Sequence, residues 1–247
     1  MPPLSELVAR ARRREPAAIG RLLSWIDNRP DKLPAIQREL AQDQQSSDTR
    51  VIGITGPPGA GKSTLLDKIL EQLVERNLRV AVLAVDPSSP FSGGAVLGDR
   101  TRLGAVAHHP NIFMRSLASR GSHGGLSEST AAMAGLLKQL DFDVVIVESV
   151  GAGQAEIAIG ELADYRIVLC PPGLGDDVQA LKAGILEIAD VLVISKGDLP
   201  GSETTEKEMR SAVGLRRSGP KPDVMRVSAT NGLGVAELVE RMLASRS

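Results

Sequence analysis

A phosphate-binding loop is encoded between Gly56 and Ser63, where the sequence GPPGAGKS fits the pattern G-x-x-x-x-G-K-[ST] in full. Glycines in such a loop let backbone N–H groups turn towards phosphates without a clash at Cβ. The helix expected to follow directs its positive N-terminal end at the same anion. Lys62 is expected to reach the β- and γ-phosphates, and the hydroxyl of Ser63 is expected to coordinate Mg²⁺. The residues predicted to bind nucleotide here are Gly56, Pro58, Gly59, Ala60, Gly61, Lys62, Ser63 and Thr64.

Three carboxylates at or near the ends of predicted strands are candidates for holding the same Mg²⁺ ion as Ser63. Glu148 ends one strand, and Gly151 follows three residues later. Nucleotide hydrolases place the Walker B carboxylate and a backbone N–H that senses the γ-phosphate at these positions. Asp86 closes a second strand, and Asp99 lies in the Gly- and Ser-rich stretch after it. Strand ends on one edge of a parallel sheet converge, so these acids are predicted to share one ion. A solvated loop carboxylate or a helix cap is the alternative for each.

Two further polar residues are candidates for completing a hydrolytic site. Gln154 lies just beyond Gly151 and is placed to orient an attacking water, although a plain surface position fits it equally well. Lys182 is one of several cationic residues able to neutralise negative charge in the transition state. With Lys62 and Glu148, these two residues make up the predicted catalytic set.

Guanine selection is indicated by the segment Ser195–Asp198, SKGD, which follows an apolar strand where a GTPase carries its Asn-Lys-x-Asp loop. Asp198 can accept hydrogen bonds from the N1–H and the exocyclic amine of guanine, and adenine offers neither. Lys196 is expected to stack its stem on the base. Ser195 departs from the pattern, and because serine reaches less far than asparagine, we expect weaker nucleotide affinity. The alternative is an ordinary turn between a strand and a helix. The residues predicted to meet the base are Ser195, Lys196, Asp198, Ser228, Ala229 and Thr230.

Short apolar runs alternate with helical patterns from Val51 onwards, and this predicts a doubly wound, mostly parallel α/β sheet of the P-loop NTPase type. Strands are predicted at Val51–Thr55, Val80–Asp86, Ile112–Ser116, Val144–Glu148, Tyr165–Cys170, Val191–Ser195 and Val224–Ser228. Helices are predicted at Lys62–Arg76, Glu128–Leu140, Asp177–Ile188, Ser202–Val213 and Val235–Leu243. Residues 1–45 are expected to form a helical N-terminal extension, with a partly disordered arm as the alternative. The GTPase domain is assigned to residues 46–247.

The bulk composition narrows the class of protein. Lys and Arg total 29 against 30 Asp and Glu, and this balance argues against a dedicated nucleic-acid binder. The single cysteine, Cys170, excludes a disulfide framework and fits a reducing compartment. The N-terminus lacks a signal-peptide pattern, and no apolar run approaches membrane-spanning length. We therefore expect a cytoplasmic protein with no membrane partner.

The chain resembles the MeaB/ArgK/MMAA family of P-loop GTPases from about Val51 to its C-terminus. The long run DPSSPFSGG that begins at Asp86 is far more specific than a phosphate loop alone. The matching segments are Gly56–Thr64, Ala84–Ala95, Leu97–Arg102, Arg115–Gly121, Val147–Gln154 and Gly184–Asp190.

This resemblance implies a GTPase chaperone that assists cofactor loading and protection of an adenosylcobalamin-dependent acyl-CoA mutase, converting GTP to GDP with Mg²⁺. It implies metal ligation at Ser63, Asp86, Asp99 and Glu148. The segment Gly173–Ile185 resembles a mobile loop that the family uses to signal to the mutase, which makes Lys182 a candidate for completing the site when the partner binds. The sequence ends soon after the helix predicted at Val235–Leu243, where the family continues into a helical arm used for dimerisation. We therefore expect a short form, either a homodimer of another mode or a monomer.

Other functions remain open on the residues alone. A GTPase that delivers nickel or zinc would need a cysteine pair or a histidine-rich stretch, whereas only His108, His109 and His123 occur here. A small-molecule kinase would generally use ATP, against which Asp198 argues. A module that binds nucleotide without turnover is a third possibility, against which the intact Lys62 and Glu148 argue.

Overall fold

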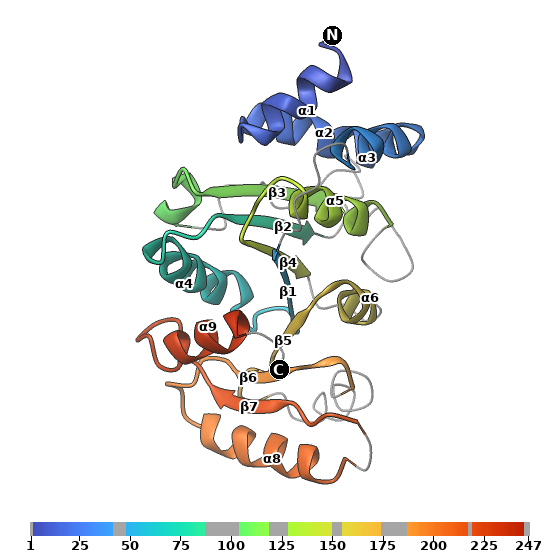
Figure 1. The fold of residues 1–247 in the computed structure, drawn as a ribbon. Coiled ribbons are helices and arrows are strands. Elements are labelled where there is room, and N and C mark those ends of the chain that lie inside the picture. The colour runs from blue at the N-terminus through green and yellow to red at the C-terminus, as the bar shows by residue number, and fades with distance from the viewer. Residues whose placement is uncertain are drawn as a thin grey trace, which may run out of the picture.

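The computed structural model describes residues 2–41, 48–86, 104–118, 128–149, 155–173, 187–216 and 219–244. A central sheet of seven strands lies between two layers of helices, which confirms the predicted α/β class (Figure 1). Among these residues, no helix combines the length and the apolar character needed to cross a membrane.

The sheet is wholly parallel among the described strands, with the order β3-β2-β4-β1-β5-β6-β7. The strands are β1 (Arg50–Thr55), β2 (Val80–Asp86), β3 (Ile112–Ala118), β4 (Val144–Ser149), β5 (Tyr165–Leu169), β6 (Val191–Ile194) and β7 (Asp223–Arg226). β1 lies at the centre, and the chain builds outward from it in both directions. The loop after β1 therefore leaves the sheet next to the point where the strand order changes direction, the usual ligand position in such sheets.

Helices cover both faces of the sheet. They are α1 (Leu4–Arg12), α2 (Pro16–Asn28), α3 (Leu33–Ala41), α4 (Lys62–Glu75), α5 (Glu128–Lys138), α6 (Ala155–Leu162), α8 (Ser202–Gly214) and α9 (Val235–Leu243), with the 3-10 turns η1 (Pro30–Lys32) and η2 (Ala105–His108). α4 and α9 lie on one face, and α5 and α6 on the other (Figure 1). α4 buries Leu66, Ile69, Leu70 and Leu73 at helical spacing against Ile54 and its neighbours, and this packing anchors the loop that precedes it.

α6 packs directly on the backbone of β1 at Gly53. A Cβ atom added at Gly53 would lie 2.3 Å from Cγ2 of Ile159 and 3.0 Å from Cβ of Ala163. Only glycine therefore lets α6 approach the central strand this closely.

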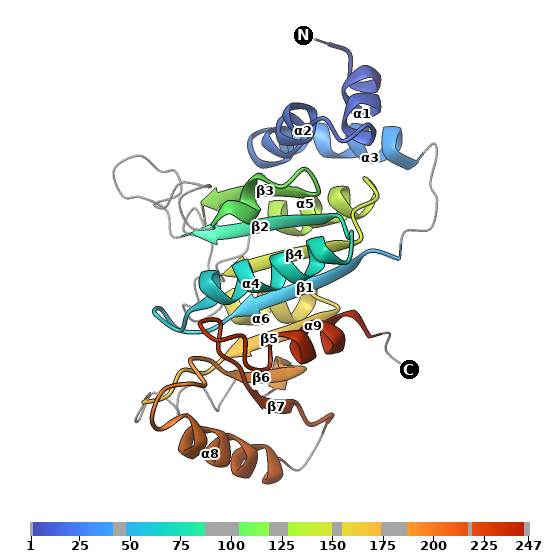
Figure 2. The same ribbon diagram turned by 90° about the vertical axis from the view of Figure 1, so that its left-hand side faces the viewer.

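The three N-terminal helices share a core with the sheet. Leu7, Ile19 and Leu22 belong to the same cluster of buried residues as Leu117 of β3 and Leu137 of α5. Both views place α1–α3 beyond β3 at one end of the sheet, whereas α8 lies beyond β7 at the other end (Figures 1 and 2). The extension therefore lies at the end of the molecule next to β3 (Figures 1 and 2).

The strands predicted from the sequence are all present, with shifted ends. β3 runs to Ala118, two residues beyond its predicted end at Ser116. β7 ends at Arg226, two residues before its predicted end at Ser228. Helix α6 was not predicted, so the sequence reading was wrong for that segment. Most of the helix predicted at Asp177–Ile188 lies outside the described residues.

Candidate active site

The loop between β1 and α4 is held against β5. Gly56 has φ 144°, and a Cβ atom there would lie 2.6 Å from the carbonyl oxygen of Leu169, so glycine is required on both counts. The loop closes with a bond from Ala60 N–H to Pro57 O (3.2 Å), and α4 begins with Leu65 N–H donating to Gly61 O (2.9 Å). Lys62 and Ser63 thus stand at the first positions of a long helix, where backbone N–H groups have no partner within the helix.

Lys62 is almost completely buried, with 7% of its surface exposed. Its Nζ donates to the carbonyl oxygens of Gly56 (2.6 Å) and Pro57 (3.0 Å). A buried ammonium group needs such partners, because desolvation of a charge is costly. The arrangement holds a positive charge within the loop predicted to bind phosphate.

Ser63 and Glu148, two residues of the predicted metal site, are in hydrogen-bond contact. β4 lies between β1 and β2, so that Glu148 stands level with Ile54 on one side and Ala84 on the other. Its carboxylate is buried, at 2% exposure, and accepts a hydrogen bond from Ser63 Oγ at 3.0 Å. No Lys, Arg or His among the described residues forms an ion pair with it. An uncompensated buried carboxylate beside a hydroxyl fits a hard divalent cation, since Mg²⁺ prefers oxygen ligands.

The strand ends at this edge are tied together. Thr55 Oγ1 and Ser149 Oγ, both buried, lie 3.0 Å apart and share a hydrogen bond between β1 and β4. Asp86 is the last residue of β2, one position beyond the pairing of Val85 with Ser149, so its backbone reaches the same edge as Glu148. This register fits the predicted convergence of acids, although the Asp86 side chain is not described.

Several predicted site residues fall outside the described part of the chain, namely Asp99, Gly151, Gln154 and Lys182. Within the described ranges, no group of three or more His, Cys, Asp or Glu side chains is arranged to hold a metal ion. The structure therefore brings together one carboxylate and one hydroxyl of the predicted metal set.

A cavity of about 110 Å³ joins the phosphate loop to the two segments predicted to meet the base. Seven of the nine residues that line it were predicted to bind nucleotide: Ala60, Gly61, Thr64, Ser195, Lys196, Ala229 and Thr230. The other two, Leu65 and Val227, were missed. Each is the immediate neighbour of a predicted residue, and this adjacency is the signal that would have found them.

The segment after β6 is fixed in a tight turn. Lys196 has φ 52°, which is uncommon for a residue with a side chain. Gly197 N–H donates to Val227 O (2.9 Å), and Ser202 Oγ donates to Gly197 O (2.9 Å). Asp198 is exposed and does not line the cavity, although it lies on the same turn. The sequence analysis did not predict that Asp198 would lie outside the cavity lining.

Ser195 lines this cavity and carries a buried hydroxyl. The residue is 4% exposed, and its Oγ has no hydrogen-bond partner among the described residues. Its backbone is held by a bond from Ser195 N–H to Cys170 O (3.2 Å). Ser228 is fully buried on the facing segment, with its N–H donating to Leu233 O (2.9 Å). An unsatisfied hydroxyl at this point is suited to a polar group of a ligand.

Comparison with known proteins places these features in a family. Residues 19–247 match the family model described as methylmalonyl Co-A mutase-associated GTPase MeaB. A GTPase candidate from Pyrococcus horikoshii is 42% identical over 247 residues, which cover 98% of this chain and 77% of that protein. The mitochondrial methylmalonic aciduria type A homolog of Mus musculus is 39% identical over 84% of this chain and 52% of its own length. A crystal structure described as an LAO/AO transport system kinase aligns with a TM-score of 0.77 at 29% identity, covering 97% of this chain and 74% of that one.

Proposed function

The chain belongs to the MeaB family of P-loop GTPases, and we propose that its GTP hydrolysis assists cofactor loading and protection of an adenosylcobalamin-dependent acyl-CoA mutase. The GTPase activity comes with the family. The mutase partner is inferred from the family, which is described as methylmalonyl Co-A mutase-associated, and from the mouse relative named for methylmalonic aciduria. The choice among acyl-CoA mutases, and the steps of loading and protection, are the finer part of the proposal.

The observation that carries the hydrolytic part is the contact between Ser63 and Glu148 beside the phosphate loop. A hydroxyl at the start of a helix and a buried carboxylate at a strand end supply the oxygen ligands expected for Mg²⁺ in a nucleotide hydrolase. When bound, Mg²⁺ neutralises negative charge on the β- and γ-phosphates. Glu148 and Ser63 hold the ion, with Asp86 and Asp99 proposed to complete the set.

We assign the other roles in GTP hydrolysis to four residues of this chain. Lys62 moves its ammonium from the loop carbonyls to the β- and γ-phosphates, where it offsets charge that grows during transfer. Gln154 orients the attacking water, Gly151 donates its N–H to the γ-phosphate, and Lys182 adds a positive charge when the partner is bound. These last three roles are proposals on residues outside the described ranges.

Base selection is assigned to the turn after β6. Asp198 accepts from guanine N1–H and the exocyclic amine, Lys196 stacks on the ring, and Ser195 meets a polar atom of the nucleotide through its buried hydroxyl. The segment 228–230 approaches guanine O6 from the opposite wall of the cavity. Adenine leaves Asp198 without a donor, so ATP binds more weakly.

The test is steady-state hydrolysis of GTP and ATP by the purified protein, with and without a purified methylmalonyl-CoA mutase. We expect turnover that is selective for GTP, requires Mg²⁺ and increases when the mutase is added. Glu148→Gln is expected to lower turnover by about 10- to 100-fold, because the carboxylate that holds the ion loses its charge. Glu208→Gln, on the exposed surface of α8, is the matched control and should not change it.

The two halves of the proposal fail separately. Turnover of ATP as fast as GTP would contradict the base assignment, and full activity of Glu148→Gln would contradict the metal assignment. If GTP turnover stays constant when the mutase is added, the GTPase assignment still holds, but methylmalonyl-CoA mutase is contradicted as the partner. Adenosylcobalamin transfer to the apo-mutase, measured by absorbance with GTP or GDP present, separates loading from protection.

A further inference from the structure

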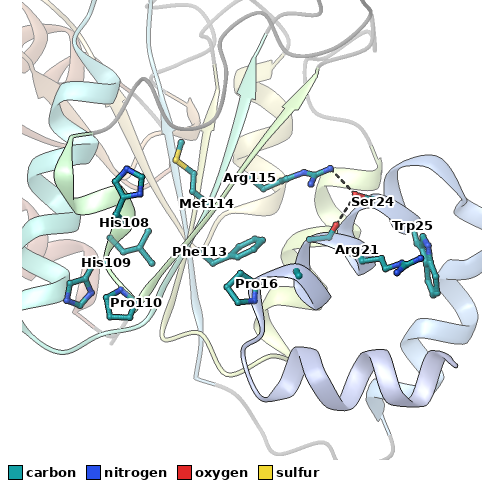
Figure 3. Close-up of a pocket in the computed structure, with 13 residues that line it drawn as sticks. Pro16, Arg21, Ser24, Trp25, His108, His109, Pro110, Phe113, Met114 and Arg115 are labelled. Carbon is teal, nitrogen blue, oxygen red and sulfur yellow. Dashed lines mark hydrogen bonds between the residues drawn. The ribbon is translucent and has the colours of Figure 1, made fainter. Parts of the chain in front are cut away.

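A groove borders β3, the strand at the outer edge of the sheet. Within the described chain, β3 pairs with β2 and with no other strand. The groove has a volume of about 940 Å³, and its floor includes the four consecutive strand residues Ile112 to Arg115. One wall is α2, which contributes Arg21 and Trp25, and the other is the turn at His108 and His109 (Figure 3). This groove lies away from the nucleotide cavity, whose lining comes from different segments.

The backbone of β3 has hydrogen-bonding groups on its outer edge that find no partner in the described part of the chain. Val80 N–H donates to Asn111 O at 2.9 Å, which fixes the phase of the parallel ladder. In a parallel pair, alternate residues bond to the neighbouring strand, so Asn111 and Phe113 face β2 while the N–H and C=O of Met114 point away from it. No described residue supplies a bond to these groups of Met114. An edge strand with free polar groups is a template for a further strand.

Side chains on both sides of β3 contribute to the groove. Phe113 packs against the cluster that contains the N-terminal helices, and Met114 packs against the cluster of α4 and α9. Arg115 extends towards α2, where its Nη2 donates to Ser24 Oγ at 3.0 Å (Figure 3). The groove therefore follows the strand edge and has binding positions above and below it.

The groove is cationic. Its positive charge comes from Arg21 and Arg115, and the described residues that line it include no Asp or Glu. Neither arginine forms an ion pair with a described residue. His109 Nδ1 accepts from Asn111 N–H (3.2 Å), so the neutral ring carries its proton on Nε2 and acts as a donor there. A partner for this surface needs negative charge.

We propose that the groove binds an extended, acidic segment of a partner protein, which adds to β3 as an eighth strand. The free backbone groups of Met114 give the segment its register, and alternate acidic side chains meet the arginines on the α2 side. A second copy of this chain fits poorly, because pairing two β3 edges would bring two cationic linings together. A compact anion would pair with the arginines but would form no hydrogen bonds along the backbone of β3. The inference does not depend on the proposed GTPase cycle.

The test uses a fluorescein-labelled, end-blocked peptide of four Glu-Val repeats and follows its anisotropy as protein is added. Met114→Pro removes the outward N–H of Met114 and leaves the bonds to β2, since proline is tolerated on an edge strand at such a position. Met114→Ala keeps the N–H and is the matched control. We expect Met114→Pro to weaken binding at least about fivefold relative to Met114→Ala, because a peptide carbonyl is left unpaired.

The charge argument is tested with Arg21→Gln, because the Arg21 guanidinium forms no ion pair with a described residue. The control is Arg38→Gln, which changes an exposed arginine of α3 outside the groove. The first should weaken binding by about two- to fivefold and the second should not. A peptide of Lys-Val repeats should not bind. Far-UV circular dichroism and GTP turnover equal to the wild type show that each variant is folded.

Hydrogen exchange on the wild-type protein gives a second measurement that needs no variant. Adding the Glu-Val peptide should slow exchange of the Met114 amide, while the Phe113 amide, which faces β2, is protected from the start. The proposal is overturned if Met114→Pro binds as tightly as Met114→Ala or if the Lys-Val peptide binds equally well. Displacement of the peptide by inorganic phosphate would indicate a compact-anion site instead. A dimer in sedimentation that Met114→Pro abolishes would indicate pairing of two copies.

Discussion

Replacement of Ser195 by alanine is expected to stabilise the nucleotide-free protein and to weaken its affinity for the nucleotide. The hydroxyl is buried and has no partner among the described residues, and such a group costs about 1–3 kcal/mol in mutational series. Removing it also removes a few packing contacts, so we expect the nucleotide-free protein to gain about 1 kcal/mol. For a chain of this size that corresponds to an increase in Tm of about 2–4 °C. If the same hydroxyl bonds the nucleotide, its loss costs about 0.5–1.5 kcal/mol, or about 2- to 13-fold in affinity.

Two assays and one matched control test this reasoning. Differential scanning calorimetry without nucleotide measures the Tm, and titration with a fluorescent GDP analogue measures the Kd. Ser202→Ala is the control, because Ser202, the first residue of α8, is equally buried but its Oγ donates to Gly197 O at 2.9 Å. That variant should lower the Tm. The reasoning is refuted if Ser195→Ala lowers the Tm like Ser202→Ala, or if it binds GDP as tightly as the wild type.

Two predictions concern stability alone. Gly53→Ala should destabilise the fold by about 1–3 kcal/mol in urea unfolding, because its Cβ would lie 2.3 Å from Ile159. The double variant with Ile159→Ala should cost less than the sum of the single variants, and simple additivity would contradict the contact. Burial raises the pKa of Tyr165 from 10.0 to about 12, so the folded state holds this proton more tightly than the unfolded state. Stability from this group should be full below pH 10 and fall by up to about 3 kcal/mol as the pH rises to 12. Tyr165→Phe should lose less stability over that interval, and an equal loss would contradict the assignment.

Contiguous signals in the sequence predicted the phosphate loop and its surroundings. Each chemical role in the loop depends on residues that are adjacent in the chain and follow an apolar strand, so local pattern is sufficient. The position of Glu148 could be predicted equally well from the sequence, since a parallel sheet brings the ends of β1 and β4 to one edge. The exposed position of Asp198 could not be predicted from the sequence, because it depends on how the turn after β6 is held by Val227.

Long-range packing explains most of what the sequence did not indicate. α6 is a short, largely apolar helix with no clear polar face, and its place is set by the missing side chain at Gly53 on a distant strand. β7 ends at Arg226. Val227 N–H still donates to Ile194 O of β6 (2.9 Å), but the carbonyl oxygen of Val227 accepts from Gly197 N–H in the turn after β6 (2.9 Å). The groove beside β3 has no motif, since α2 and β3 are far apart in the sequence and meet only in the folded protein.

The cavity proposed to bind nucleotide has a consequence for the order in which its parts are made. Its described lining begins at Ala60 and ends at Thr230, so every residue between these two must leave the ribosome before the walls can meet. A parallel sheet of this kind also forms its contacts late, because each strand pairs with a segment distant in the sequence. If this cavity holds the nucleotide as proposed, a nascent chain gains no stabilisation from GTP at these walls until β7 has joined β6. Nucleotide occupancy in the cell would then distinguish chains in which both walls are in place from chains in which they are not.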